Sequence, residues 1–205
     1  MPDDAGRLPL LGGALCLDFT NTLEPWGAEQ PREFITTYPG LLAWAVHAGA
    51  LPTEQAADLS ALAEAQPAAA SAVLDQARSL RRAIYRLFSS AAQGRPAGKD
   101  DLEWLNSVLA EAGRQRCLEQ SGAGYAWGWR GVEADLHAVL WPVAFSAADI
   151  LASPQLGRVR ACAGCGWLFL DGSRPGTRRW CDMRVCGNRA KARRHYARAR
   201  EAMSP

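Results

Sequence analysis

The sequence predicts a mainly α N-terminal body with a small β-sheet (an α+β arrangement), followed by a treble-clef-like C-terminal module. Three observations support this fold class. Apolar residues recur at helical spacing over most of the first 155 residues. Two short stretches alternate apolar and polar residues as strands do. Four of the six cysteines stand in two close pairs near the C-terminus, ahead of a basic segment. We therefore expect two domains, residues 1–155 and residues 156–205.

The small sheet is predicted from two stretches of alternating residues. Residues 14–20 alternate apolar with other side chains and end at a polar corner, Asn21-Thr22. Residues 116–130 contain Tyr125, Trp127 and Trp129 at alternate positions among glycines, which is typical of an aromatic strand. We expect these two strands to pair and to pack against the helices.

The helices of the body are predicted from apolar spacing and from their end signals. The clearest is a long amphipathic helix over residues 67–92, with one apolar stripe and several arginines beside or across it. The others are expected over residues 41–47, from Thr53 as N-cap, after Asp100-Asp101, and over residues 132–152 with a kink at Pro142.

The cysteine spacing in the C-terminal module predicts a metal site. The pattern is C-x2-C, fifteen intervening residues and C-x4-C, formed by Cys162, Cys165, Cys181 and Cys186. Two short pairs separated by a hairpin can present four thiolates tetrahedrally, as a structural Zn²⁺ requires. The alternatives are a disulfide pair, a redox C-x-x-C and four unrelated thiols. A disulfide needs an oxidising compartment, and a redox pair leaves the second pair and the surrounding basic residues unexplained. We therefore expect one structural Zn²⁺.

The expected location is the cytoplasm. The N-terminus is acidic and has no signal peptide, and no apolar run approaches the roughly 20 residues of a membrane span. The two remaining cysteines, Cys16 and Cys117, are expected to be free, buried thiols, which fits a reducing compartment.

Charge is divided unevenly along the chain. The net charge is +2, but residues 158–205 carry twelve basic and three acidic residues, whereas residues 1–157 carry eleven basic and eighteen acidic residues. This asymmetry points to an anionic partner for the tail. It also suggests that the acidic body could rest against the basic tail and mask it.

The segment after Cys186 is rich in alanine and arginine and predicts a helix with charge on two opposite sides. Such a helix cannot bury a wide apolar face, but it suits phosphates on both sides of a groove in double-stranded DNA. The alternative is a solvated helix whose arginines pair with the acidic body. The expected DNA-binding residues are Arg178, Arg179, Arg184, Arg189, Lys191, Arg193, Arg194, Arg198 and Arg200.

The body carries no catalytic motif that we can identify, so we expect a protein that is not an enzyme. No nucleophile elbow or phosphate-binding loop occurs, and His47 and His137 stand in settings typical of packed or surface residues. Asp18, Thr20 and Asn21 could line a pocket for a small effector. Alternatively, the polar side chains of this corner satisfy turn backbone.

The tail resembles the CGNR zinc finger, whose signature is Cys186-Gly187-Asn188-Arg189. The resemblance extends over residues 158–198 and includes both cysteine pairs. The body resembles the ABATE domain on its Leu17-Asp18-Phe19-x-Asn21-Thr22 opening and its order of helices. This resemblance implies a bacterial protein with a zinc-dependent DNA-binding tail and a body that senses a small ligand.

The expected function is therefore a bacterial zinc-dependent transcription regulator that responds to a small ligand or stress signal. One small zinc module makes few base contacts, so a homodimer on two half-sites is expected. The alternative is an enzyme or an RNA-binding accessory protein in which the zinc finger is purely structural.

Overall fold

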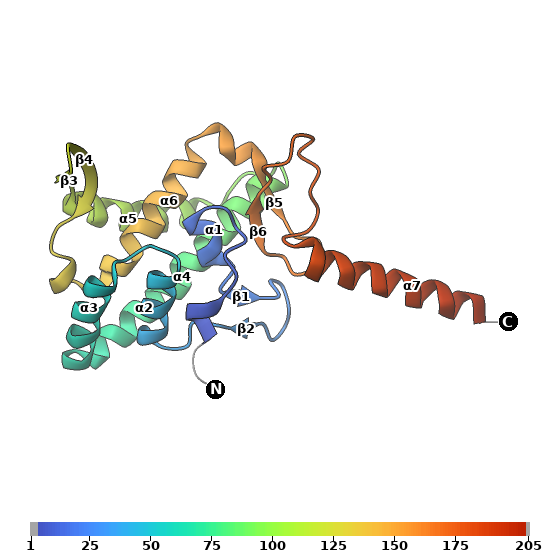
Figure 1. The fold of residues 1–205 in the computed structure, drawn as a ribbon, viewed down its shortest axis with the longest axis horizontal. Coiled ribbons are helices and arrows are strands. Elements are labelled where there is room, and N and C mark those ends of the chain that lie inside the picture. Colours follow the sequence, from blue (N-terminus) through green and yellow to red (C-terminus); the bar gives the residue numbers. More distant parts are fainter. Residues whose placement is uncertain (1–3, 204–205) are drawn as a thin grey trace.

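Helices and three short hairpins build the chain in a computed structural model, which describes residues 4–203, with side chains described for residues 5–197 (Figure 1). The α-helices are α1 (Leu15–Thr20), α2 (Tyr38–His47), α3 (Thr53–Ala65), α4 (Pro67–Ala92), α5 (Lys99–Gln115), α6 (Trp141–Leu151) and α7 (Asn188–Met203). The antiparallel strand pairs are β1 (Leu23–Glu24) with β2 (Arg32–Glu33), β3 (Arg116–Ser121) with β4 (Gly124–Trp129), and β5 (Val159–Ala161) with β6 (Leu168–Leu170). Single 3₁₀ or π turns are η1 (Asp4–Arg7), η2 (Val132–Ala134), η3 (Leu136–Leu140), η4 (Pro154–Arg158) and η5 (Met183–Gly187). The predicted fold class is confirmed.

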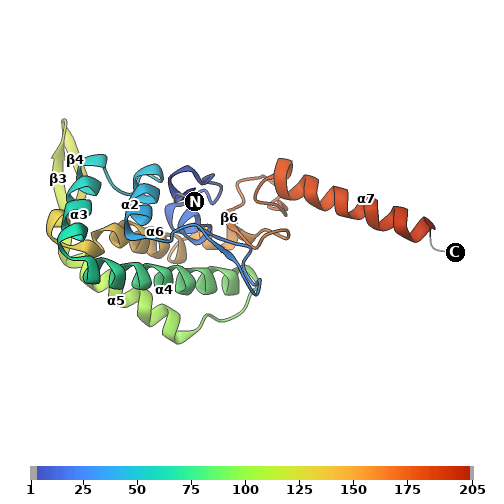
Figure 2. The ribbon, with the colours of Figure 1, turned by 90° about the horizontal axis from the view of Figure 1, so that it is seen from below.

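The long helix α4 runs along the body, with α5 lying beside it (Figure 2). Pro67 occupies its first position, where the missing N–H costs nothing, and its alanine-rich start favours the helix. Its apolar stripe is fully buried, including Leu80, Ile84 and Phe88. Each such side chain contributes about 1.5–3 kcal/mol through burial. The predicted helix over residues 67–92 is confirmed.

The predicted strand over residues 14–20 is wrong, because this segment forms the short helix α1. The helix packs against α4, α6 and β6, so most of its circumference is buried. A helix buried on several sides lacks the single apolar stripe that identifies a helix in sequence. Six residues are also too few for the two periods to be distinguished reliably.

The aromatic strand over residues 125–129 forms as β4, but its predicted pairing is wrong. It pairs with β3 in a hairpin, in which Leu118 lies opposite Trp127. The turn contains Gly122, whose φ of +58° is in the left-handed region that glycine tolerates. The local hairpin is reached by a tight turn, whereas residues 14–20 are helical and offer no strand edge.

The predicted helix over residues 132–152 is shorter than expected. Two 3₁₀ turns precede it, and α6 begins at Trp141, with Pro142 in its first turn. Proline is favoured there, because its ring would clash with the preceding turn anywhere later in the helix. Pro142 therefore starts the helix instead of kinking it.

The C-terminal module packs on the body and shares its core. Val159, Leu168 and Phe169 are fully buried and belong to the same apolar cluster as Leu17 and Trp44 of the body. Beyond this packed part, α7 projects away from the rest of the molecule (Figures 1 and 2).

None of the helices in the described part of the chain combines the length and apolar character that crossing a membrane requires.

Candidate metal centre and nucleic-acid interface

Four cysteines converge at one buried point of the C-terminal module. Cys162 and Cys165 lie in the turn between β5 and β6, whereas Cys181 and Cys186 lie on either side of the start of η5. Their four Sγ atoms all lie within 4.8 Å of one another, and all four residues are buried. Folding thus brings together two pairs separated by fifteen residues.

The spacing of the sulfur atoms fits a zinc ion. Four thiolates at about 2.3 Å from a tetrahedral Zn²⁺ have sulfur atoms about 3.8 Å apart. The Sγ of Cys181 lies 3.7 Å from the Sγ atoms of both Cys165 and Cys186. A disulfide would require about 2.05 Å, and all six cysteines are free thiols. The four cysteines are positioned to bind one Zn²⁺.

The electrostatics of the cluster favour a bound cation. Hydrogen bonds from the Cys165 and Cys181 thiols hold the pKa of Cys162 well below its usual range. The Cys162 thiolate in turn raises the pKa values of Cys165 and Cys181, and burial raises that of Cys186. Four adjacent thiols therefore cannot all ionise without a compensating charge. A divalent cation supplies that charge and displaces the remaining protons.

Two glycines allow the first cysteine pair to form its turn. Gly166 has a φ of +79°, and a Cβ there would lie 2.9 Å from the Cβ of Trp26. A Cβ on Gly164 would lie 3.3 Å from the Cβ of Cys186. Small residues at these positions therefore permit the close approach of the turn to the body and to the fourth ligand.

Asp171 organises the loop between the cysteine pairs. Its buried carboxylate accepts hydrogen bonds from the backbone and hydroxyl of Ser173 and from the backbone N–H of Arg178. These bonds, chiefly the one from the Ser173 hydroxyl, lower the pKa of Asp171 to about 2. Its role is to hold the loop that returns the chain to Cys181.

Arg178, one of the expected DNA-binding residues, braces this same loop. Its guanidinium donates hydrogen bonds to the carbonyls of Trp180 and Cys181, and its Cζ lies 4.6 Å from the centre of the Phe169 ring. These contacts place the third cysteine relative to the core.

The opening segment of the body holds the zinc module through hydrogen bonds that each include at least one backbone group. The buried Asn21 side chain donates to the carbonyl of Leu168 and accepts from the same residue's N–H, both at 2.9 Å. The Trp167 indole donates to the carbonyl of Leu23, and the backbone N–H of Trp26 donates to the carbonyl of Cys165. The Asn21-Thr22 corner therefore joins the body to the metal centre.

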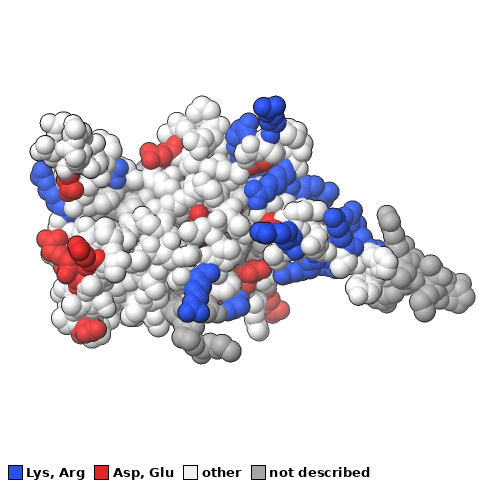
Figure 3. Space-filling view, viewed as in Figure 1, with Lys and Arg blue, Asp and Glu red and all other residues white. Residues whose placement is uncertain are grey.

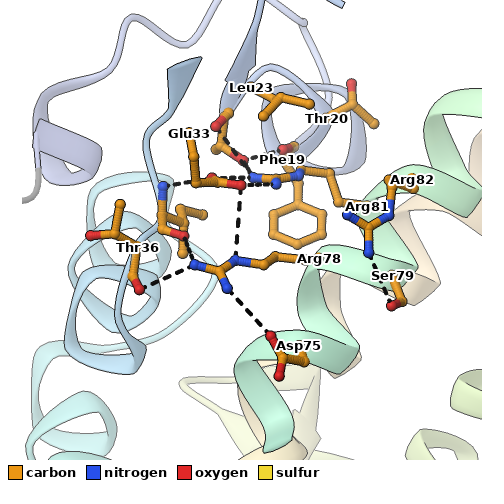
Figure 4. A network of polar contacts seen from close by, with 12 residues as sticks. Phe19, Thr20, Leu23, Glu33, Thr36, Asp75, Arg78, Ser79, Arg81 and Arg82 are labelled. Atoms are coloured by element: carbon orange, nitrogen blue, oxygen red, sulfur yellow. Dashed lines mark hydrogen bonds and ion pairs between the residues drawn. The ribbon is translucent and has the colours of Figure 1, made fainter. Parts of the chain in front are cut away.

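A buried arginine supports this corner from α4 (Figure 4). Arg81 is 1% exposed and donates to the carbonyl and hydroxyl of Thr22 and to the carboxylate of Glu33. Arg78 lies one turn away and donates to the carbonyls of Ile35 and Thr36. Sequence reasoning did not assign Arg81 a role, because it flanks the apolar stripe of α4 as a solvent-exposed arginine would.

The three residues expected at an effector pocket make structural contacts. The carboxylate of Asp18 accepts the N–H of Gly12 at 2.7 Å, and the hydroxyl of Thr20 donates to the carbonyl of Leu17 at 2.7 Å. Asn21 binds Leu168 as described above. All three side chains thus form hydrogen bonds with backbone groups, as expected from the alternative to an effector pocket.

Asp18 predicts a specific pH dependence. Burial raises its pKa from 3.8 to about 6, although the hydrogen bond from Gly12 opposes the shift. Between about pH 4 and 6 the folded chain therefore holds a proton that the unfolded chain has lost, so stability falls as pH rises through this window. In Asp18→Asn this contribution should disappear, since the amide oxygen still accepts from Gly12. Urea unfolding of both chains at pH 4 to 7 measures it; a difference in unfolding free energy independent of pH would contradict the assignment.

The basic residues gather over the zinc module and α7 (Figure 3). Arg179, Arg184, Arg189, Lys191, Arg193 and Arg194 are all exposed. Among the described side chains of α7 and the module, the ion pair found is that of Arg184 with Asp182, at 3.8 Å. Arg198 and Arg200 lie in the part of α7 where side chains fall outside the described residues. The described arginines of α7 form no ion pair with the body. The arrangement suggested by the charge division, in which the acidic body rests against the basic tail, is therefore not the one in this structure.

Both histidines of the body are held in hydrogen bonds. His47 Nε2 lies 2.8 Å from the carbonyl oxygen of Leu8. His137 lies between Asp135 and Gln76, with 2.9 Å from each ring nitrogen to a side-chain oxygen. Neither contact includes a nucleophilic side chain.

Comparison with known proteins places both parts of the chain. Residues 158–199 match the model of the CGNR zinc finger, which contains the four cysteines described above. Residues 13–154, more than half of the chain, match the ABATE model, whose description is "Putative stress-induced transcription regulator". A search of curated proteins finds no match. The chain therefore belongs to the ABATE family and carries a C-terminal CGNR zinc finger.

Proposed function

We propose that this protein is a bacterial, cytoplasmic transcription regulator whose zinc module binds double-stranded DNA. The observation that carries the proposal is the set of exposed basic side chains around the zinc centre and on α7, which no carboxylate of the body neutralises among the described residues. Uncompensated cations on one surface attract a polyanion, and phosphate contacts supply much of the affinity of DNA-binding proteins.

The shape of α7 suits this role. The helix spans 16 residues, about 24 Å at 1.5 Å per residue, and stands clear of the body. The major groove is about 12 Å wide and admits a helix with phosphates on either side. We assign DNA contacts to Arg179, Arg184, Arg189, Lys191, Arg193, Arg194, Arg198 and Arg200. Arg178 would act indirectly, by fixing the loop that bears Cys181.

The two family matches suggest a separate role for each part of the chain. Residues 1–155 would form the regulatory body and residues 156–205 the DNA-binding module. An effector that shifts the Asp18-Thr20-Asn21 segment would move the module directly, since Asn21 bonds to Leu168. A homodimer would place two modules on two half-sites, and sedimentation of the free protein and of its DNA complex tests this arrangement.

Charge reversal on α7 tests the proposal. In Arg189→Glu with Lys191→Glu, duplex affinity at fixed salt should fall at least about 100-fold. The slope of log K against log salt should shrink by about 1.8, since each lost phosphate contact removes about 0.9. Fluorescence anisotropy of a labelled duplex across a salt series measures both quantities.

The matched control reverses two exposed arginines of the body, Arg82→Glu with Arg95→Glu, and so changes the net charge equally. It should bind almost as the native chain does. Equal weakening by both pairs would mean that net charge alone attracts DNA, and the assignment of α7 would be wrong.

A further inference from the structure

A hollow of about 290 Å³ lies between the first cysteine turn and the start of α7. It is lined by Gly164, Arg179, Trp180, Ala190, Arg193 and Arg194, among others. Ala190, Arg193 and Arg194 are three and four residues apart, so one face of α7 turns all three toward the zinc centre. Arg179 comes from the loop opposite, so arginines from two separate elements line the hollow.

Small residues leave this space open. Ala190 forms part of the helix wall, and Gly164 forms part of the turn, where even a Cβ would lie 3.4 Å from the Trp180 ring. The Trp180 ring closes one side, with the Cζ of Arg179 5.7 Å from its centre. The indole thereby helps to restrict where the Arg179 guanidinium can lie.

The positive charge around the hollow favours binding of an anion. Three arginines line it, no acidic residue does, and none of the three arginines forms an ion pair among the described residues. A zinc ion with four thiolates carries a formal charge of −2, and Cys186 also lines the hollow. The three positive charges exceed this, and guanidinium forks match the oxygen atoms of a phosphate.

We infer that this hollow is a binding site for a single phosphate group, and that its ligand is one phosphodiester of the DNA backbone. The inference rests on the proposed function and deepens it, because it fixes the point at which the DNA is anchored. One phosphate held beside the zinc centre by Arg179, Arg193 and Arg194 would orient the rest of α7 along the duplex.

A salt series on the zinc-loaded full chain distinguishes a shared site from three separate contacts. Replacing Arg179, Arg193 and Arg194 together by glutamine should reduce the salt slope by about 0.9, because one phosphate is lost. Three independent phosphate contacts would reduce it by about 2.7, and that result would overturn the inference. The matched control, Arg82, Arg95 and Arg114 to glutamine, removes three exposed arginines of the body and should leave the slope unchanged.

A second variant tests the shape of the site without changing its charge. Ala190→Leu places an isobutyl group in the hollow and should weaken duplex binding at least about 10-fold, with the slope again smaller by about 0.9. Circular dichroism and zinc content establish that the variant is folded. Native affinity in folded Ala190→Leu would overturn the inference.

Failure of the phosphate site and failure of the proposed DNA binding give different results. If the native chain binds no duplex even at low salt, the proposed function fails, and thermal unfolding with inorganic phosphate then examines the hollow alone. Stabilisation of the native chain but not of the triple glutamine variant would retain the phosphate site and assign it to a free phosphate ligand. Absence of stabilisation would overturn the site itself.

Discussion

Replacing Cys181 by serine should abolish zinc binding and unfold the C-terminal module. Its Sγ lies 3.7 Å from the Sγ atoms of both Cys165 and Cys186, so the substitution removes one of the four thiolate ligands. Structural zinc contributes about 10–16 kcal/mol of binding free energy in zinc-finger peptides, which is also folding free energy. Native mass spectrometry should find one Zn²⁺ in the native chain and none in the variant. The fluorescence of Trp167 and Trp180 should report the unfolding.

The matched control for this experiment is Cys117→Ser. Cys117 is buried at the start of the β3–β4 hairpin, outside the thiolate cluster, and should leave zinc content unchanged. Because Leu168 and Phe169 share the core of the body, Cys181→Ser should also lower the unfolding temperature of the body. Full zinc content in Cys181→Ser would refute the assignment of the four ligands.

Replacing Asn21 by alanine should detach the zinc module from the body without removing a metal ligand. Asn21 is 2% exposed, and its amide satisfies both the N–H and the carbonyl of Leu168. An unsatisfied buried polar group costs about 1–3 kcal/mol, so we expect a loss of about 2–6 kcal/mol in unfolding free energy. Denaturant unfolding measures this loss, and hydrogen exchange at Leu168 should accelerate in parallel.

Asn106→Ala provides the comparison, because Asn106 is exposed on α5 and should change stability by less than about 0.5 kcal/mol. If Asn21→Ala unfolds at the same denaturant concentration as Asn106→Ala, the two bonds to Leu168 do not hold the module. Zinc content in Asn21→Ala should remain that of the native chain, which separates docking from metal binding.

The metal centre could be predicted from sequence because all four ligands lie within one short segment of the chain. Cysteine has few roles, and two short pairs at this spacing leave little choice of ligand set. The same holds for α4, where 26 residues of consistent period and an initial proline determine the element without help from its neighbours.

The rest depends on tertiary contacts that no short window reveals. Residues 15–20 became a helix because α4, α6 and β6 surround them, and this burial removed the polar side that identifies an amphipathic helix. Arg81 has the same residue type and spacing as the exposed arginines of α4. Its burial depends on Thr22 and Glu33, which are 59 and 48 residues away in the chain.

The Asn21-Thr22 corner depends on both local sequence and tertiary contacts. Its sequence allowed either an effector pocket or a turn whose side chains satisfy backbone groups. The backbone groups that it satisfies include those of a strand 147 residues later. Because this corner fixes the zinc module to the body, a change in the body would reach the proposed DNA-binding surface through it.

The most direct test of the central claim is selection from a random duplex pool by the zinc-loaded chain across a salt series, beside the Cys181→Ser variant. We predict that the native chain binds with a steep salt dependence and enriches one sequence, and that the variant loses both properties. Equal binding by the two chains would show that the zinc module does not recognise DNA. Absence of binding by the native chain at low salt would assign the exposed arginines of α7 to another anionic partner.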